Sequence, residues 1–323
     1  MSDAILEVEG LRKTFGGIVA VDGATFDIAE GSITGLIGPN GAGKTTTFNL
    51  ISGFYEPDGG TVRYDGRDLQ TIMRPHRDET VIWGGASGLT VGTLGGVVGL
   101  GPLGLGAAPA VGATVAGAAL GAGGYLAKQR VTQRRPGHTN SRPYMLAREG
   151  LVRTFQLTRE LGDMTALENL MLAPQGQAGE NLANAWFRRG AVAEEEASVR
   201  ERAEETLELL EIDHLRDEPA GNLSGGQRKL LELGRVLMLE PRVILLDEPV
   251  AGVNPALTEK LMARIEALRA DGYTFCIVEH DMEVIMELSD TIIVMNEGKK
   301  LVEGQPEEIR NDEAVIDAYL GVG

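Results

Sequence analysis

The residues best suited to chemistry form a glycine-rich loop near the start of this 323-residue chain. The loop reads Gly38-Pro-Asn-Gly-Ala-Gly-Lys44-Thr45; it follows the apolar run ITGLI and opens the segment TTTFNLI. Glycines let backbone N–H groups curl around phosphate oxygens, and a helix N-terminus adds positive potential. Lys44 would reach the β- and γ-phosphates of a nucleotide, and the Thr45 hydroxyl would ligate Mg²⁺. The alternative is a plain glycine turn, but the complete motif in its required context favours an ATP site, with contacts from Gly38, Pro39, Asn40, Gly41, Ala42, Gly43, Lys44, Thr45 and Thr46.

A second pair of candidate residues ends an apolar run, Val243-Ile-Leu-Leu-Asp247-Glu248. The four apolar residues predict a buried strand, and α/β sheets bind ligands at the carboxyl ends of their strands. Asp247 would hold Mg²⁺, directly or through water, and Glu248 would orient the attacking water or take its proton. Many apolar strands end in solvated acids. The phosphate loop earlier in the chain favours the catalytic interpretation here.

A third motif, Leu223-Ser-Gly-Gly-Gln227, lies between these two. Ser224 and the two glycines precede the segment QRKLLELGRVLM and would cap a helix N-terminus that suits anions. In isolation, a plain helix cap is the better interpretation. In this order, however, the pentapeptide resembles the signature of the ABC ATPase family. The resemblance implies that one subunit binds the γ-phosphate held by the other subunit's loop, through Ser224, Gly225, Gly226 and Gln227.

Further positions resemble those of the same family. Gln156, in Arg-Thr-Phe-Gln, resembles the glutamine that senses Mg²⁺ and water and contacts the transmembrane partner. His280 ends the run FCIVEH and resembles the switch histidine near the γ-phosphate; the alternative is an ordinary strand-end histidine. Phe15 resembles the aromatic residue that stacks on adenine; the alternative is a core phenylalanine. Asn254 stands in a stretch that resembles the family's inter-subunit loop, at a position where the family more often has aspartate.

Several stretches resemble the ATP-binding subunits of branched-chain amino acid importers, including Met164-Thr-Ala-Leu-Glu-Asn, Glu279-His-Asp-Met and the terminal Ala-Tyr-Leu-Gly. Related subunits serve urea or amide uptake and lipopolysaccharide export. The resemblance implies a second ATP-binding subunit, identical or different, and transmembrane permease subunits, with an extracytoplasmic solute-binding protein as an indirect partner. It places the chain at the cytoplasmic face of the cell membrane.

The elements that must position these residues predict an α/β fold. Apolar strands alternate with amphipathic helices, which indicates a largely parallel sheet covered on both faces. The resemblance makes this a P-loop ABC ATPase with a mixed core sheet, an antiparallel β subdomain and a helical subdomain at about 157–235 that carries the signature. We assign the ATPase domain to residues 1–72 and 143–323.

Residues 73–142 are different in kind and form a Gly/Ala-rich insertion. Residues 81–101 and about 110–127 are each near the ~20 apolar residues that span a bilayer core. Glycine or alanine at every fourth position permits close helix contact, and arginine and lysine flank both ends, as in a hairpin whose ends face the cytoplasm. A helical hairpin that contacts the membrane through 81–127 is one interpretation, and a loose low-complexity loop is the other, because glycine disfavours isolated helices.

Composition limits the remaining alternatives. The net charge of −17 opposes non-specific binding to nucleic acid, so we expect no nucleic-acid partner and disfavour a soluble ABC-type ATPase acting on chromosomes. A non-hydrolysing regulatory binder would be expected to lack a residue equivalent to Glu248 or His280. Both residues are present, which disfavours that alternative. The acidic surface would also suit a salt-rich cytoplasm. The single cysteine, Cys276, excludes an internal disulfide and fits a reducing compartment.

Overall fold

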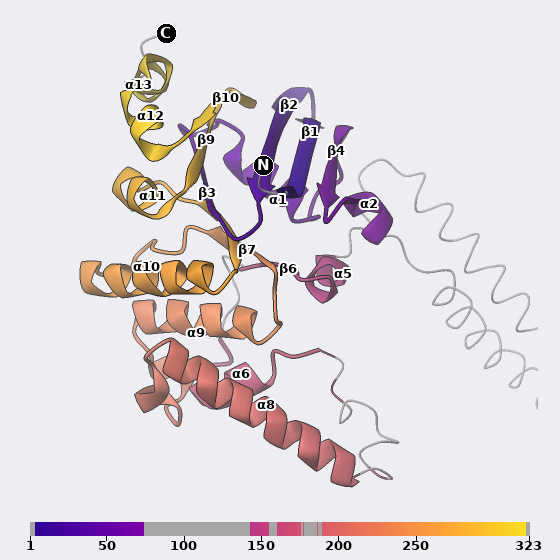
Figure 1. Cartoon of the computed structure of the whole chain (residues 1–323), viewed down its shortest axis with the longest axis vertical. Helices are drawn as coiled ribbons and strands as arrows, with labels where there is room; N and C mark the ends of the chain where they lie inside the picture. The colour runs from indigo at the N-terminus through magenta and orange to yellow at the C-terminus, as the bar shows by residue number, and fades with distance from the viewer. Residues whose placement is uncertain are drawn as a thin grey trace, which may run out of the picture. The chain divides into compact units, whose positions relative to one another are not determined.

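The computed structural model of the chain describes residues 4–73, 143–154, 160–175, 177, 186 and 189–320. Apart from Met73, these belong to one compact unit, Met1–Ile72 with Arg142–Gly323 (Figure 1). Of the insertion predicted at 73–142 only Met73 is described. The boundaries and the hairpin therefore stay predictions.

The first sheet is antiparallel and forms the β subdomain expected from the sequence. Its order is β2-β1-β4-β5. The strands are β1 (Ala4–Phe15), β2 (Ile18–Ala29), β4 (Gly59–Tyr64) and β5 (Arg67–Asp68). The tight turn between β1 and β2 is made by Gly16 and Gly17, both with positive φ, a conformation that glycine adopts without steric cost. This turn leaves Phe15 at the very end of its strand.

The second sheet is mixed and has the order β10-β9-β3-β8-β7-β6. Its strands are β3 (Ile33–Ile37), β6 (Leu151–Arg153), β7 (Val243–Asp247), β8 (Thr274–Val278), β9 (Thr291–Asn296) and β10 (Lys299–Gly304). Neighbouring strands from β6 to β9 run parallel, and β10 is antiparallel to β9. Every residue of β3, β7 and β8 is buried, as expected for parallel strands covered on both faces.

Parallel strands place their carboxyl ends at one edge of the sheet, and that edge gathers the motifs. The phosphate loop follows β3, Arg153 ends β6, Asp247 ends β7, and Glu279 with His280 follow β8. Side chains separated by more than two hundred positions in the sequence therefore meet here. The predicted α/β class with a mixed core sheet is confirmed.

The helices pack against the two sheets or against one another. They are α1 (Lys44–Ile51), α2 (Leu69–Ile72), α5 (Pro143–Arg148), α6 (Ala166–Met171), α8 (Arg189–Leu209), α9 (Gly225–Leu237), α10 (Pro255–Ala270), α11 (Met282–Leu288), α12 (Pro306–Asn311) and α13 (Glu313–Leu320). Short 3₁₀ turns occur at Asp213–Leu215 and Ala220–Asn222. Helices α6, α8 and α9 pack together. The sequence predicts the helical subdomain at about 157–235; α6 and α8 lie in that range, and α9 begins in it and ends at Leu237. No helix of the described ranges is long and apolar enough to cross a membrane.

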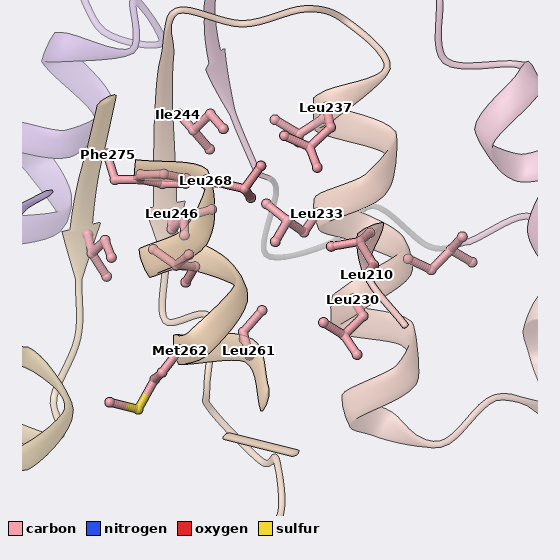
Figure 2. Close-up of a cluster of buried hydrophobic side chains, with 14 of the residues drawn as sticks. Leu210, Leu230, Leu233, Leu237, Ile244, Leu246, Leu261, Met262, Leu268 and Phe275 are labelled. Atoms are coloured by element: carbon pink, nitrogen blue, oxygen red, sulfur yellow. The ribbon is translucent and has the colours of Figure 1, made fainter. Parts of the chain in front are cut away.

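The hydrophobic core joins the sheet to α9 and α10. Figure 2 shows side chains of β7 and β8 facing leucines of both helices. Ile244 and Phe275 are fully buried, and Leu233 and Leu268 pack with them at 1–2% exposure. Burying such side chains contributes roughly 1.5–3 kcal/mol each. This core fixes the strand ends, and hence the site, against the helix that carries the signature.

Candidate functional site

The phosphate loop has the backbone shape that its glycines predict. Gly38 has φ +149° and Gly43 has φ +95°; a Cβ on Gly38 would lie 2.1 Å from the Met295 carbonyl oxygen, and one on Gly43 would lie 2.4 Å from the Ala20 carbonyl oxygen. These close approaches exclude any side chain at either position. Gly43 is the N-cap of α1 and offers no side-chain cap, which leaves the first N–H groups of the helix for a ligand.

Lys44 is the buried cation of this loop. Only 5% of the residue is exposed, and Nζ donates hydrogen bonds to the carbonyl oxygens of Gly38 (2.6 Å) and Pro39 (3.0 Å). Burial lowers the Lys44 pKa, which the Glu248 carboxylate partly offsets. The ammonium therefore spans the loop, and its two partners are neutral carbonyl oxygens that anionic phosphate oxygens would replace. Thr45 is exposed and Thr46 half-buried at the mouth of the loop.

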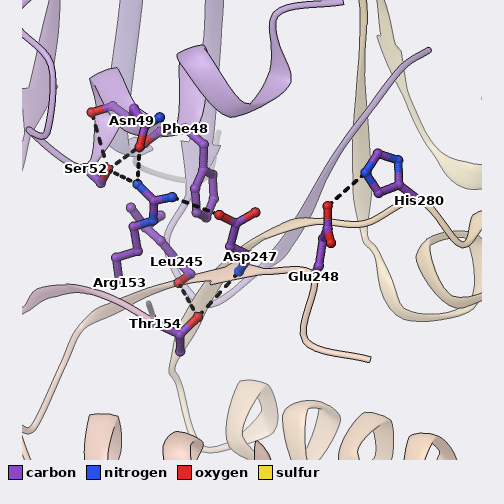
Figure 3. Close-up of polar contacts among 9 residues, drawn as sticks. All are labelled: Phe48, Asn49, Ser52, Arg153, Thr154, Leu245, Asp247, Glu248 and His280. Atoms are coloured by element: carbon purple, nitrogen blue, oxygen red, sulfur yellow. Dashed lines mark hydrogen bonds and ion pairs between the residues drawn. The ribbon is translucent and has the colours of Figure 1, made fainter. Parts of the chain in front are cut away.

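Asp247 lies at the end of β7 and is held by a network drawn in Figure 3. Its Oδ2 accepts a hydrogen bond from Nη2 of Arg153 at 2.8 Å, within an ion pair whose side chains are 2% and 11% exposed. Its backbone N–H donates to Oγ1 of Thr154 at 3.4 Å. Arg153 binds Oδ2, whereas Oδ1 accepts no hydrogen bond from the described residues and is the freer oxygen for a metal ion.

Glu248 and His280 lie side by side at the same edge, within ion-pair distance. Nε2 of His280 lies 2.9 Å from Oε1 of Glu248, and both side chains are partly exposed (Figure 3). Glu248 has φ +50°, which is uncommon for a residue with a Cβ and is a strain found at functional sites. Its backbone N–H is fixed by the Val278 carbonyl at 2.8 Å. A carboxylate beside an imidazole and a phosphate loop has the geometry of a general base for water.

Glu279, which precedes His280, is buried. Its Oε1 accepts from the Val250 backbone N–H at 2.9 Å and its Oε2 from the His280 backbone N–H at 3.0 Å. Burial raises the Glu279 pKa, although backbone hydrogen bonds from Val250, His280 and Asp281 oppose the rise. One carboxylate thus joins the loop after Glu248 to the loop that carries His280.

The signature residues begin α9. Ser224 is its N-cap in a reciprocal capping box: Oγ accepts from the Gln227 N–H at 3.4 Å, and Oε1 of Gln227 accepts from the Ser224 N–H at 2.8 Å. Ser224 and Gly225 are exposed. A Cβ on Gly226 would lie 2.4 Å from Cδ1 and 2.9 Å from Cβ of Leu257, so this glycine lets α9 approach α10. Among the described residues, no hydrogen bond or ion pair joins the signature to the phosphate loop of the same chain.

Phe15 is not a core phenylalanine, because 41% of it is exposed. Its ring contacts Tyr55 edge-on at 5.3 Å, and Lys13 Nζ lies 5.6 Å from its centroid. Asp58 fixes this strand end: its Oδ2 accepts from the Thr14 N–H and hydroxyl, both at 2.7 Å. The ring is thus available for a base, and adenine stacking stays a prediction.

Two further residues singled out from the sequence are Gln156 and Asn254. Gln156 lies outside the described residues, so its metal and partner roles stay predictions. Asn254 acts as the N-cap of α10, where its Oδ1 accepts from the Leu257 N–H at 3.0 Å.

No cluster of three metal-ligating side chains occurs in the described part of the chain. The Thr45 hydroxyl and a carboxylate oxygen of Asp247 are oxygen donors of the kind that Mg²⁺ takes, so these residues would suit that ion beside a bound nucleotide.

Sequence reasoning assigned no role to Arg153 or Glu279. Both are charged residues next to recognised motifs, which is the only signal the sequence carried. Their burial and partners depend on residues about a hundred and about thirty positions away.

An apolar groove of about 310 Å³ lies beside this edge. Its walls include Phe54, Leu151, Arg153 and Val236, so it runs between the core sheet and the helical subdomain. The groove adjoins the position where the chain continues from Thr154 towards Gln156.

Comparison with known proteins accounts for this arrangement. The ABC transporter family model matches residues 21–87 and 124–251, and a model of the branched-chain amino acid ATP-binding cassette transporter matches residues 299–323. The chain is 35% identical to the high-affinity branched-chain amino acid transport ATP-binding protein BraF of Pseudomonas aeruginosa, over 99% of both proteins. It is 34% identical to the probable branched-chain amino acid transport ATP-binding protein LivG of Archaeoglobus fulgidus, over 98% of this chain and 95% of that protein.

Solved structures give the same answer for the fold. The ADP conformation of an ATP-binding cassette of an ABC transporter is 31% identical, with a TM-score of 0.67 over 99% of this chain and all of that one. A nucleotide-free cassette is 32% identical, with a TM-score of 0.65 over 98% of this chain and 99% of that one. The predicted family and fold are confirmed: this chain belongs to the ABC transporter family, as an ATP-binding cassette.

Proposed function

We propose that the chain hydrolyses ATP with Mg²⁺ and thereby powers import of branched-chain amino acids through membrane-embedded partner subunits. The observation that carries hydrolysis is the Glu248–His280 pair, 2.9 Å apart at the strand edge that also presents Lys44 and Asp247. The solute is supported by the relatives, whose names specify branched-chain amino acid transport. Urea or amide uptake and lipopolysaccharide export are the alternatives within the family.

In this mechanism, backbone N–H groups of the phosphate loop and of the first turn of α1 bind the β- and γ-phosphates; Pro39 has no N–H and donates nothing. Lys44 exchanges its carbonyl partners, Gly38 and Pro39, for phosphate oxygens, and a desolvated ammonium interacts with them more strongly than a solvated one. The Thr45 hydroxyl and Asp247 would hold Mg²⁺, which supplies positive charge against the charge that develops on the transferred group. Phe15 stacks on the adenine.

Glu248 accepts the proton of the attacking water, or orients that water. His280, within hydrogen-bond distance of the Glu248 carboxylate, holds it towards the γ-phosphate. A positioned general base of this kind contributes about 10²–10⁴-fold to the rate. Glu279 fixes the backbone on both sides of the pair.

The site requires a second ATP-binding subunit. The exposed N-terminus of α9 offers its first N–H groups and the dipole of a thirteen-residue helix. Among the described residues it makes no hydrogen bond or ion pair with its own phosphate loop. Two copies, or this chain and a similar subunit, would each complete the other's site with Ser224, Gly225, Gly226 and Gln227.

We place the transmembrane partner in the apolar groove beside Arg153 and Val236. A cytoplasmic segment of a permease subunit would fit there, next to the stretch that leads to Gln156. Binding at this groove would put the chain on the cytoplasmic face of the membrane. An extracytoplasmic solute-binding protein would act on the permease alone.

The first test is ATP hydrolysis by the wild type and Glu248→Gln, with size-exclusion chromatography in MgATP. We expect slow wild-type turnover, a loss of about 10²–10⁴-fold in the variant, and an ATP-dependent dimer that accumulates in the variant. Glu283→Gln, on the exposed face of α11, is the matched control and should behave as wild type. Equal turnover in Glu248→Gln and wild type would refute the catalytic assignment.

The solute is tested with the partner subunits present. Membrane vesicles that contain the chain with its permease and binding protein should take up radiolabelled leucine when ATP is inside. Uptake of urea in place of leucine would overturn the substrate assignment and leave the ATPase assignment intact. Deletion of residues 76–141 in the same assay reports whether the insertion is needed for coupling.

A further inference from the structure

Arg153 is a largely buried cation without a role in the mechanism above. Its side chain is 11% exposed, and its ion-pair partner Asp247 is 2% exposed. Removing a charge from water costs several kcal/mol unless the charge is paired and hydrogen-bonded. Such a pair adds little net stability compared with apolar residues, so stability alone does not explain why the metal-binding carboxylate is paired here.

The guanidinium is held from three sides, as Figure 3 shows. Beyond Asp247, its Nη1 donates to Oδ1 of Asn49 at 2.5 Å and to Oγ of Ser52 at 3.1 Å. Its centre lies 4.8 Å from the centroid of the Phe48 ring and 5.1 Å from that of Phe54. Arginine alone offers a planar fork that bonds two partners while it stacks on aromatic rings. Lysine would carry the charge without this fixed geometry.

These contacts connect two parts of the site. Asn49 belongs to α1, the helix that the phosphate loop opens, whereas Asp247 ends β7. Arg153 therefore fixes the direction of the Asp247 carboxylate relative to the helix whose first turn carries Thr45, the other protein ligand expected for Mg²⁺. Arg153 also forms part of the wall of the apolar groove.

We propose that Arg153 is a positioning residue for the metal site: it holds Oδ2 of Asp247 and so directs Oδ1 to Mg²⁺, from the wall of the groove where the membrane partner would bind. The inference rests on the proposed function, because it requires the chain to bind MgATP. Groups that orient a metal ligand from behind typically change metal affinity about 10- to 100-fold when they are replaced.

The test measures how much Mg²⁺ strengthens nucleotide binding, with a fluorescent ATP analogue titrated in Mg²⁺ and in EDTA. In Arg153→Lys we expect the gain in affinity from Mg²⁺ to fall about 10- to 100-fold, with affinity in EDTA within about twofold of wild type. Asn49→Ala leaves the charge in place and removes one anchor, so it should give a smaller loss in the same direction. Arg148→Lys, at the end of α5 and away from Asp247, is the matched control with no change.

The outcomes separate the interpretations. An unchanged Mg²⁺ gain in both Arg153→Lys and Asn49→Ala would overturn the inference. An equal loss of nucleotide affinity with Mg²⁺ and with EDTA would also overturn it, because it would indicate a structural role. A larger Mg²⁺ gain in Arg153→Met than in wild type would overturn it too, because it would show that the arginine acts by repelling the cation. A wild type that binds the analogue in neither buffer would instead refute the proposed function, and the inference with it. Thermal denaturation without nucleotide checks folding, and Asn49→Ala keeps the test valid if Arg153→Lys does not fold.

Discussion

Replacing Glu279 with glutamine should separate catalysis from stability. The side chain keeps its size and one carbonyl oxygen, but an NH₂ group replaces the other oxygen. That NH₂ would face a backbone N–H, either of Val250 or of His280, because each carboxylate oxygen now accepts one of them. Either the loop after Glu248 or the loop that carries His280 therefore loses its hydrogen bond to residue 279.

The cost to folding is small because two effects oppose each other. A hydrogen bond to a charged group contributes about 1.5–3 kcal/mol, and its loss leaves a donor unsatisfied. Against this, the raised pKa of Glu279 shows that burial penalises its charged form, and glutamine removes that penalty. We expect the free energy of unfolding to change by about 1 kcal/mol or less at neutral pH. Hydrolysis should fall much further, because a displacement of about 1 Å at a reacting group can cost about 10²-fold.

The pH dependence follows from the direction of the shift. The folded-state pKa of Glu279 lies above the ordinary value of 4.5, so the unfolded chain releases this proton first. The contribution of Glu279 to stability is complete below about pH 4.5 and is lost as the pH rises through the folded-state value. The stability of Glu279→Gln relative to wild type should therefore improve as the pH rises above about 4.5.

The assay is urea denaturation at several pH values together with steady-state ATP hydrolysis. Glu283→Gln, an exposed change on the adjacent helix α11, controls for the loss of a negative charge. Unchanged hydrolysis in Glu279→Gln would refute the reasoning that this carboxylate positions the catalytic loops. A stability loss of several kcal/mol that is independent of pH would show that the hydrogen bonds, not the burial of charge, dominate its energetics.

Three further predictions concern single residues. Asp58→Asn should lower the free energy of unfolding by about 1 kcal/mol at pH 7, a small value because the Asp58 side chain is 40% exposed and solvent screens its interactions. Hydrogen bonds from Thr14 and Lys13 lower the Asp58 pKa to about 2. In urea denaturation, the stability difference from wild type should therefore narrow as the pH falls from about 4 towards 2. Gly226→Ala should destabilise the fold by about 1–3 kcal/mol through overpacking against Leu257, and a melting temperature equal to wild type would contradict this. Burial raises the Cys276 pKa to about 12, so maleimide at pH 7 should label the folded protein far more slowly than the urea-unfolded chain, and equal rates would refute its burial.

Local motifs could be predicted because they depend on backbone conformation within a few residues. The glycines of the phosphate loop, the Ser224–Gln227 cap and the buried run of β7 each express a local rule, and the folded chain follows all three. The order of the motifs also sufficed for the family. A long insertion leaves the residues of each motif and their order along the chain unchanged, so the motifs on both sides of the apolar segment could still be recognised.

The network behind the site could not be predicted in the same way. The pairing of Arg153 with Asp247, and of Glu279 with the loop after Glu248, depends on which strands are neighbours and on which side chains are withdrawn from water. Burial removes the charge of an arginine or glutamate from water, which costs free energy unless the charge is paired and hydrogen-bonded, and the partners then fix the orientation of the side chain. The sequence by itself determined the phosphate loop, the acid pair, the signature and the family. Only the tertiary structure decided which charged side chains hold them in place, because the energy of a charge depends on the solvent and partners that folding gives it.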